Sequence, residues 1–118
     1  MANPNLVNIT SVTGHVALGN AVGTSYSTIV TNSSSSGKLY KINSINVANM
    51  ASENIGAYVE LVRGGTTYSL ANDITVAAKS TLVVVTKDNM VYLNEGDSIQ
   101  AKATADSIDV IISYDQLS

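Results

Sequence analysis

Hydrophobic and polar residues alternate along most of this chain with a period of two. The clearest case is residues 55–62, in which the apolar parity consists of Ile55, Ala57, Val59 and Leu61. A period of two places successive side chains on opposite faces of a strand, and clusters of Gly, Asn, Asp and Ser separate such runs. No window combines a 3.6-residue apolar period with helix caps. The pattern predicts an all-β protein of about 8–10 short strands.

Residues 82–85 depart from this alternation because all four are apolar. A run that is apolar on both parities predicts a strand that is covered on both faces and lies deep in the protein. In a single curved sheet one of these faces would meet water, so two packed sheets are favoured. The predicted fold is therefore a single-domain antiparallel β-sandwich with jelly-roll-like topology.

Two local features refine this prediction. Along the long strand expected at residues 38–49, Tyr40 and Ile42 share one parity while Ile45 and Val47 share the other. A β-bulge near residues 43–44 would keep both pairs facing inward. Further on, residues 63–66 contain two adjacent glycines, which predicts a tight hairpin turn with positive φ angles.

The first 37 residues are less regular than the rest. We expect a strand that begins at Leu6 and is ended by Gly14, then a second short piece at residues 15–18 that Gly19 and Asn20 close. The predicted organisation is residues 1–37 as N-terminal strands or an arm of the same domain, and residues 38–118 as the β-sandwich core. Such an arm could reach a neighbouring subunit.

Composition narrows the function. The chain has 118 residues and no cysteine, so disulfides and thiolate metal sites are excluded. Only 13% of the residues are charged, against about 25% in typical domains, and the net charge is -3. We therefore expect no nucleic-acid partner and no membrane partner. The N-terminal residues lack the basic and apolar regions of a signal peptide, so synthesis in a cytoplasm is expected.

Candidate catalytic chemistry is sparse, and we expect no enzyme activity and no cofactor. His15 is the sole histidine, so a nucleophile–histidine–acid arrangement would depend on this one residue. Residues 95–97, Glu-Gly-Asp, are typical of a turn whose carboxylates bind local backbone N–H groups. Asp106 and Asp109 could hold a calcium ion with backbone carbonyls, but they lack the repeated spacing of a dedicated loop. No metal site is predicted.

One candidate contact surface stands out. Tyr58 and Val62 have the parity opposite to the core set of their strand, and Tyr68 lies across the predicted hairpin. These three residues could form an apolar strip on a polar domain, which would mark a contact with a partner. Exposed tyrosines could also stack on sugar rings, so weak glycan binding is an alternative use.

Three segments give the chain a family resemblance. They are residues 40–49 (YKINSINVAN), residues 59–68 (VELVRGGTTY), and residues 91–99 (VYLNEGDSI) with the ending at 112–115 (ISYD). Over residues 38–118 the chain resembles small all-β virion structural proteins of tailed bacteriophages, including phages of marine cyanobacteria. The pattern in residues 93–99 is also similar to tumour-necrosis-factor-like and complement-type jelly rolls.

The resemblance implies a multi-copy structural component of a virus particle. It favours a capsid decoration or cement protein in the virion, which would bind itself as a homo-oligomer, with a trimer favoured, and bind other virion proteins such as the major capsid protein. A neck, tail or fibre component is the alternative. A carbohydrate- or receptor-binding β-sandwich module is a second class of function, motivated by the tyrosines.

Overall fold

The computed structural model describes residues 6–105 and 108–118. These residues form nine β-strands and two short 3₁₀ turns, which confirms the all-β prediction. The strands are β1 Val12–Val22, β2 Ser27–Thr31, β3 Leu39–Asn49, β4 Ile55–Arg63, β5 Thr66–Val76, β6 Thr81–Val85, β7 Val91–Leu93, β8 Ser98–Ala103 and β9 Ile108–Leu117. The 3₁₀ turns are η1 Leu6–Asn8 and η2 Lys87–Asn89.

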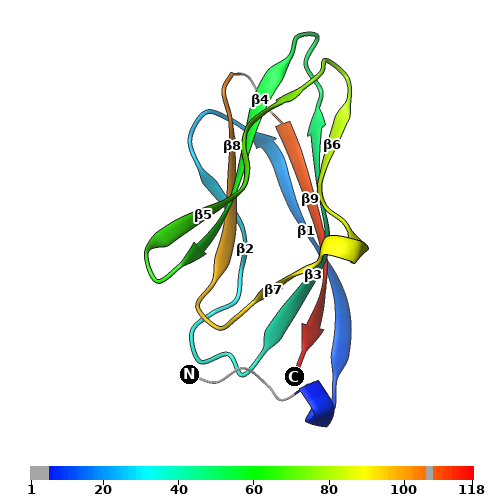
Figure 1. The fold of residues 1–118 in the computed structure, drawn as a ribbon, viewed down its shortest axis with the longest axis vertical. Helices are drawn as coiled ribbons and strands as arrows, with labels where there is room; N and C mark the ends of the chain where they lie inside the picture. Colours follow the sequence, from blue (N-terminus) through cyan, green and yellow to red (C-terminus); the bar gives the residue numbers. More distant parts are fainter. Residues whose placement is uncertain (1–5, 106–107) are drawn as a thin grey trace.

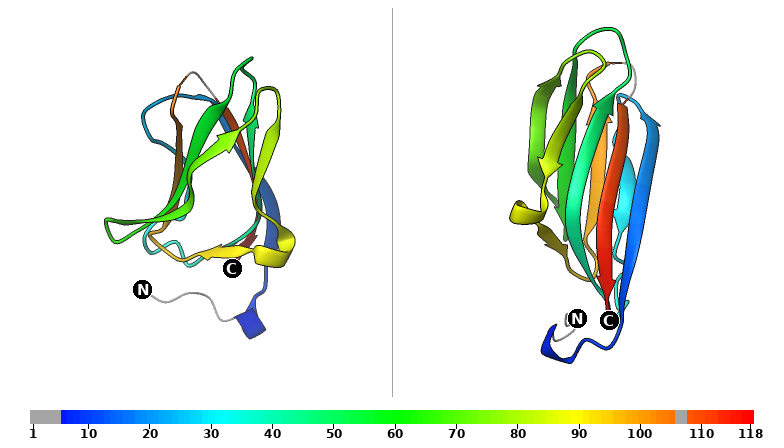
Figure 2. Two further views of the ribbon diagram at one scale, coloured as in Figure 1. Left: turned by 45° about the horizontal axis from the view of Figure 1, so that its top comes forward. Right: turned by 90° about the vertical axis from the view of Figure 1, so that its right-hand side faces the viewer.

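The strands form two antiparallel sheets that pack face to face as a β-sandwich (Figures 1 and 2). The first, sheet A, has the order β1-β9-β3-β6, with β7 also pairing with β3. The second, sheet B, has the order β2-β8-β4-β5. The chain crosses between the sheets after β1, β2, β3, β5, β7 and β8, and β6 and β7 together fill one strand position. This arrangement is that of a jelly roll, as predicted.

The core lies between the inner faces of the two sheets. Its fully buried side chains are mainly branched aliphatic residues from the four central strands, β3 and β9 in one sheet and β4 and β8 in the other. The largest of them are Ile42, Ile45, Ile55, Leu93, Ile99, Ile108 and Ile112. β-branched side chains suit a pleated surface that is covered on one face, and removing this apolar surface from water is the main term that stabilises the fold.

The predicted bulge in β3 is confirmed. The pairing of β3 with β9 shifts between Ile42 and Ser44, so Asn43 is the additional residue. Because of this shift, Ile42, Ile45 and Val47 all point inward and are fully buried. Without the extra residue, one half of the strand would turn its isoleucine and valine toward water.

The predicted hairpin turn is also confirmed. Arg63 pairs with Thr66 at the ends of β4 and β5, and the two residues between them, Gly64 and Gly65, have φ angles of 59° and 78°. Two positive φ angles are characteristic of a two-residue turn whose twist matches that of the flanking strands. The hairpin projects sideways from sheet B, at the left of Figure 1.

The prediction for residues 82–85 is wrong in one respect. These residues belong to β6, which lies at an edge of sheet A and not at its centre. Leu82 and Val84 pack partly against the core, whereas Val83 points away from it and is 54% exposed. An apolar residue on the outer face therefore gave the run its two-sided pattern, and the most deeply buried strands are those that alternate.

The N-terminal prediction is wrong in its boundaries. Residues 6–8 form a 3₁₀ turn, and β1 then continues from Val12 to Val22 through both Gly14 and Gly19. Pairing with β9 maintains the strand where local propensity would end it, because glycine weakens a strand without preventing backbone hydrogen bonds. A Cβ at Gly19 would lie 2.6 Å from the side chain of Ile29, so this glycine allows close packing.

We expect Gly65→Val to lower the free energy of unfolding by about 1–2 kcal/mol, the cost of a left-handed conformation for a residue with a Cβ. Gly14→Val is the matched control, because neither position has an atom closer than 4.0 Å to the added Cβ and Gly14 has no positive φ. Urea denaturation of both variants measures the difference. Equal stability of the two variants would contradict the turn assignment.

Candidate protein-contact surface

The outer face of sheet A carries a row of side chains, three of them large and apolar, that crosses four of its five strands. Leu18 in β1 pairs with Ile111 in β9, and Ile111 and Val83 both pair with Asn46 in β3. Directly paired residues point to the same face of a sheet, so these four side chains lie side by side. Leu18 is 70%, Val83 54% and Ile111 41% exposed. Large apolar side chains gathered on one outer face are typical of a protein-contact site.

The neighbouring row extends this surface without adding charge. Val16 in β1 pairs with Ser113, and Ser113 pairs with Ser44. Val16 is as exposed as its neighbours in the first row. Together the two rows define the sheet A face, which consists of Val16, Leu18, Ser44, Asn46, Val83, Ile111 and Ser113. Its centre holds apolar and neutral polar side chains only, so a partner can cover it without desolvating a charge.

A shallow groove lies at the β1 end of the sheet A face. It has a volume of about 250 Å³ and is lined mainly by Leu18, Gly19, Asp109 and Ile111. Asp109 is held in place here, because its Oδ1 accepts a hydrogen bond from the backbone N–H of Ala21 at 3.0 Å. Ala21 has a φ of 53°, so this bond supports a left-handed residue where the pairing of β1 with β9 becomes irregular.

The sequence prediction missed the sheet A face, and it placed Tyr58, Val62 and Tyr68 together where the structure does not. Tyr58 and Val62 do share the outer face of sheet B. Tyr68, however, pairs directly with Leu61, which packs against the core from the inner face. Tyr68 therefore lies on the opposite face of the hairpin, and the strip of three residues does not form. Contact of these residues with a partner stays a prediction.

The ring of Tyr58 is already engaged within the protein. The ammonium nitrogen of Lys102 lies 4.7 Å from the ring centroid of Tyr58 and 4.7 Å from that of Tyr26. Both distances fall within the range of cation–π attraction. The Lys102 ammonium group thus covers one face of each ring. A sugar would also need a ring face for stacking.

A carboxylate completes this cluster on sheet B. Glu60 lies between Tyr58 and Val62 on the outer face, and its Oε1 accepts a hydrogen bond of 2.9 Å from Gln100. Burial, together with a hydrogen bond and the negative charge of Glu60, raises the pKa of Tyr26 to about 12. Each effect disfavours the phenolate form, so Tyr26 remains a neutral hydrogen-bond donor.

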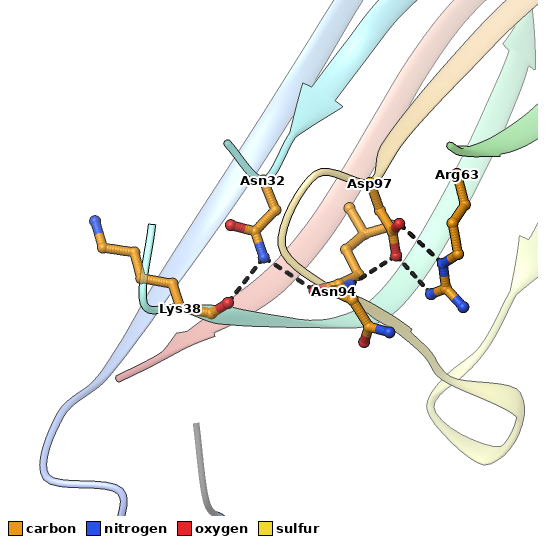
Figure 3. A network of polar contacts seen from close by, with 6 residues as sticks. Asn32, Lys38, Arg63, Asn94 and Asp97 are labelled. Atoms are coloured by element: carbon orange, nitrogen blue, oxygen red, sulfur yellow. Dashed lines mark hydrogen bonds and ion pairs between the residues drawn. The ribbon is translucent and has the colours of Figure 1, made fainter. Parts of the chain in front are cut away.

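A buried polar network fixes the opposite end of sheet B (Figure 3). Asp97 is almost fully buried and pairs with Arg63, whose Nε and Nη2 donate to the two carboxylate oxygens at 2.9 and 2.5 Å. The backbone N–H of Asn94 also donates to Asp97, at 2.8 Å. The hydrogen bond to Asp97 raises the pKa of Arg63 further. The predicted turn at residues 95–97 is therefore present, and Asp97 binds a local backbone N–H as expected. The carboxylate of Glu95 does not, because it accepts a hydrogen bond from the distant backbone N–H of Gly37 at 3.1 Å.

Asn32 extends the network to the start of β3. It is fully buried, and its Nδ2 donates to the carbonyl oxygens of Lys38 and Leu93 at 2.9 and 3.1 Å. Its Oδ1 accepts a hydrogen bond from the hydroxyl of Ser36. A buried amide that meets its hydrogen-bonding needs in this way fixes the loop after β2 against the β7–β8 turn. The network thus joins the loop after β2, the β7–β8 turn and the end of β4.

The remaining candidate groups are dispersed. The ring of His15 stacks on that of Tyr114, with centroids 5.4 Å apart, and Tyr40 stacks on the same tyrosine. Asp106 lies outside the described residues, so the calcium alternative with Asp109 is not placed. Across residues 6–105 and 108–118, no three His, Cys, Asp or Glu side chains gather as metal ligands would. In the same residues no helix has the length and apolar character needed to cross a membrane.

The fold and these contacts define a jelly-roll β-sandwich with an apolar outer face. No protein-family model matches the chain, and no curated protein matches it. Among solved structures, a subunit of the disulfide-linked pili that form Bacillus endospore appendages aligns over 100% of this chain and 94% of its own length, with 12% identity and a TM-score of 0.55. At this identity the likeness concerns the fold alone, and this chain has no cysteine for such a linkage.

Two structures of a pentameric capsid protein from metagenomic phage sequences also align. They cover 86% of this chain with 23% and 21% identity, and each has a TM-score of 0.41. The chain spans 62% and 60% of the length of those two proteins.

The first prediction from this region concerns the ion pair. Arg63→Ala should lower the free energy of unfolding by about 1–3 kcal/mol, because it leaves a buried carboxylate without its charged partner. Lys87→Ala, which removes an exposed lysine, is the control and should be neutral within about 0.5 kcal/mol. Urea denaturation at neutral pH measures both. If the two variants unfold alike, the pair does not stabilise the fold.

The second prediction concerns Tyr26. Its ionisation should be centred near pH 12 in the folded protein, and Glu60→Gln should lower this pKa by removing the charged acceptor. Because the folded-state pKa lies above the ordinary value of 10.0, the stabilisation from Tyr26 is complete below pH 10 and is lost as the pH rises toward 12. The difference in tyrosinate absorbance between the wild type and Tyr26→Phe isolates this group. An unchanged pKa in Glu60→Gln would refute the contact.

Proposed function

We propose that this protein is a non-enzymatic structural component of a phage virion that acts through multi-copy protein–protein contacts. Its place in the particle is the capsid surface, as a decoration or cement protein that binds the major capsid protein. A neck, tail or fibre position is the alternative. The family resemblance of residues 38–118 supports the virion assignment.

The observation that carries the proposal is the sheet A face. Leu18, Ile111 and Val83 expose apolar surface to water on one face of the sheet. A partner that covers this face would gain free energy by removing that surface from water. The side chains between these three residues are neutral, and the carboxylate of Asp109 that borders the face already accepts a hydrogen bond from the backbone N–H of Ala21. Its residues come from strands that the core holds rigidly, which limits the entropy lost on binding.

The other side chains support a role without catalysis. His15 is occupied by stacking on Tyr114, and the buried carboxylate of Asp97 is neutralised by Arg63. The aromatic rings of Tyr26 and Tyr58 are occupied by Lys102. The polar groups with the most specific surroundings therefore serve the fold, which supports a contact role for the apolar side chains of the sheet A face.

The test is the composition of the particles. Mass spectrometry of virions of the encoding phage, purified by density gradient, should detect this chain in many copies, and immunogold labelling should place it on the capsid. Labelling of the neck or tail would select the alternative position. If the chain is abundant in infected cells but missing from purified particles, the virion assignment is wrong.

A face variant sharpens the test. When a phage that lacks the gene is supplied with Val83→Lys, the number of copies per particle should fall at least about tenfold, because a charge is buried in the contact. The matched control is Lys87→Ala, which lies outside the sheet A face and should be incorporated normally. Normal incorporation of Val83→Lys would move the contact to another surface.

A further inference from the structure

The free edge of β1 lacks the residues that usually protect an edge strand. No other strand of the described residues pairs with it, because β1 is the terminal strand of sheet A. From Val12 to Val22 it contains no Lys, Arg, Asp, Glu or Pro. Edge strands that stay solitary usually carry such residues, because unpaired backbone N–H and C=O groups are a template for another strand.

The edge of β1 is also the longest regular one. Eight consecutive residues, Val12 to Gly19, pair with β9 without a shift in register. The other edge strands are less suitable: β5 has two irregularities in its pairing, β2 and β6 have one each, and β7 has three residues. The view onto sheet A shows β1 at its border, beside β9 (Figure 2, right).

We infer that β1 pairs antiparallel with β1 of a second copy of this chain, which joins the two A sheets into one continuous sheet. The choice of a second copy as the partner follows from the length and regularity of this edge. Residues 6–105 and 108–118 offer no other regular edge of this length, so the best match for β1 is β1 itself, and antiparallel pairing of identical strands closes as a two-fold dimer. The strand carries no formal charge, although the whole chain has a net charge of -3, so pairing of two β1 strands brings no like charges on these strands together.

The geometry joins this edge to the sheet A face. A two-fold axis normal to the sheet keeps both outer faces on the same side, so Val16 and Leu18 of one copy continue the apolar surface of the other. The dimer therefore presents a surface twice as wide. The inference goes beyond the proposed virion role, because the pairing is a property of the purified chain whether or not it enters a particle.

A cysteine scan tests the pairing, since the chain contains no native cysteine. Thr13, Gly14, His15, Val16, Ala17 and Leu18 are replaced one at a time, and disulfide formation is measured on a non-reducing gel. Only the residue on the axis meets its own copy at a Cα distance of roughly 5 Å, whereas its neighbours are roughly 8 Å from theirs, too far for a disulfide. One position should therefore cross-link strongly and the others weakly. Val83→Cys, on the opposite edge, is the control.

Native mass spectrometry of the wild type, Val16→Lys and Val83→Lys gives an independent measurement. The wild type should be a dimer or a larger even-numbered assembly, Val16→Lys should be monomeric, and Val83→Lys should remain dimeric. Both valines are more than half exposed, so circular dichroism should show both variants folded. A wild-type monomer, a wild-type trimer, or equal cross-linking at all positions including Val83 would overturn the inference. A dimer that is missing from virions would instead leave the pairing intact and refute the virion role.

Discussion

The structure depends on the burial of one apolar layer between two sheets. The central strands β3, β9, β4 and β8 present isoleucine, valine and alanine to this layer, and their backbone groups are paired on both sides. Two consequences follow from the same constraint. The inner faces are fully used by folding, and every strand that is not central must leave one side of its backbone unpaired. The surfaces available for interaction are therefore the outer faces and the four edges.

Buried asparagines and one ion pair hold the ends of the sandwich. Asn49, at the end of β3, is almost fully buried, and its Nδ2 donates to the carbonyl oxygens of Glu53 and Val76 at 2.8 and 3.0 Å. At the other end, Asn32 and Asp97 play the corresponding part. Loops around an apolar core need such partners, because backbone groups that are buried without a hydrogen bond are costly. Polar residues thus set where the strands stop, while apolar residues set how the layers pack.

The alternating runs were sufficient to predict the fold class, the β3 bulge and the hairpin at Gly64 and Gly65. Each of these follows from side-chain parity or backbone conformation, which are local properties of the chain. The position of residues 82–85 and the continuity of β1 were not predictable in this way, because both depend on which strand lies alongside. The same reason explains the contact surface: Leu18, Ile111 and Val83 are far apart in the sequence, and only the strand order brings them into one row. Tyr68 was misplaced because the pairing of β4 with β5 decides its face.

The neutral centre of the sheet A face determines how the affinity of any assembly through this face depends on salt concentration. Dissolved salt at 0.1 M largely screens interactions between exposed charges that lie more than about 10 Å apart, but it does little to weaken contacts made of apolar side chains and backbone hydrogen bonds. Assemblies built through this face would keep nearly the same affinity in dilute buffer and in brine. Kosmotropic ions such as sulfate would strengthen these contacts slightly. The ionic strength of the medium would therefore have little effect on whether subunits dissociate.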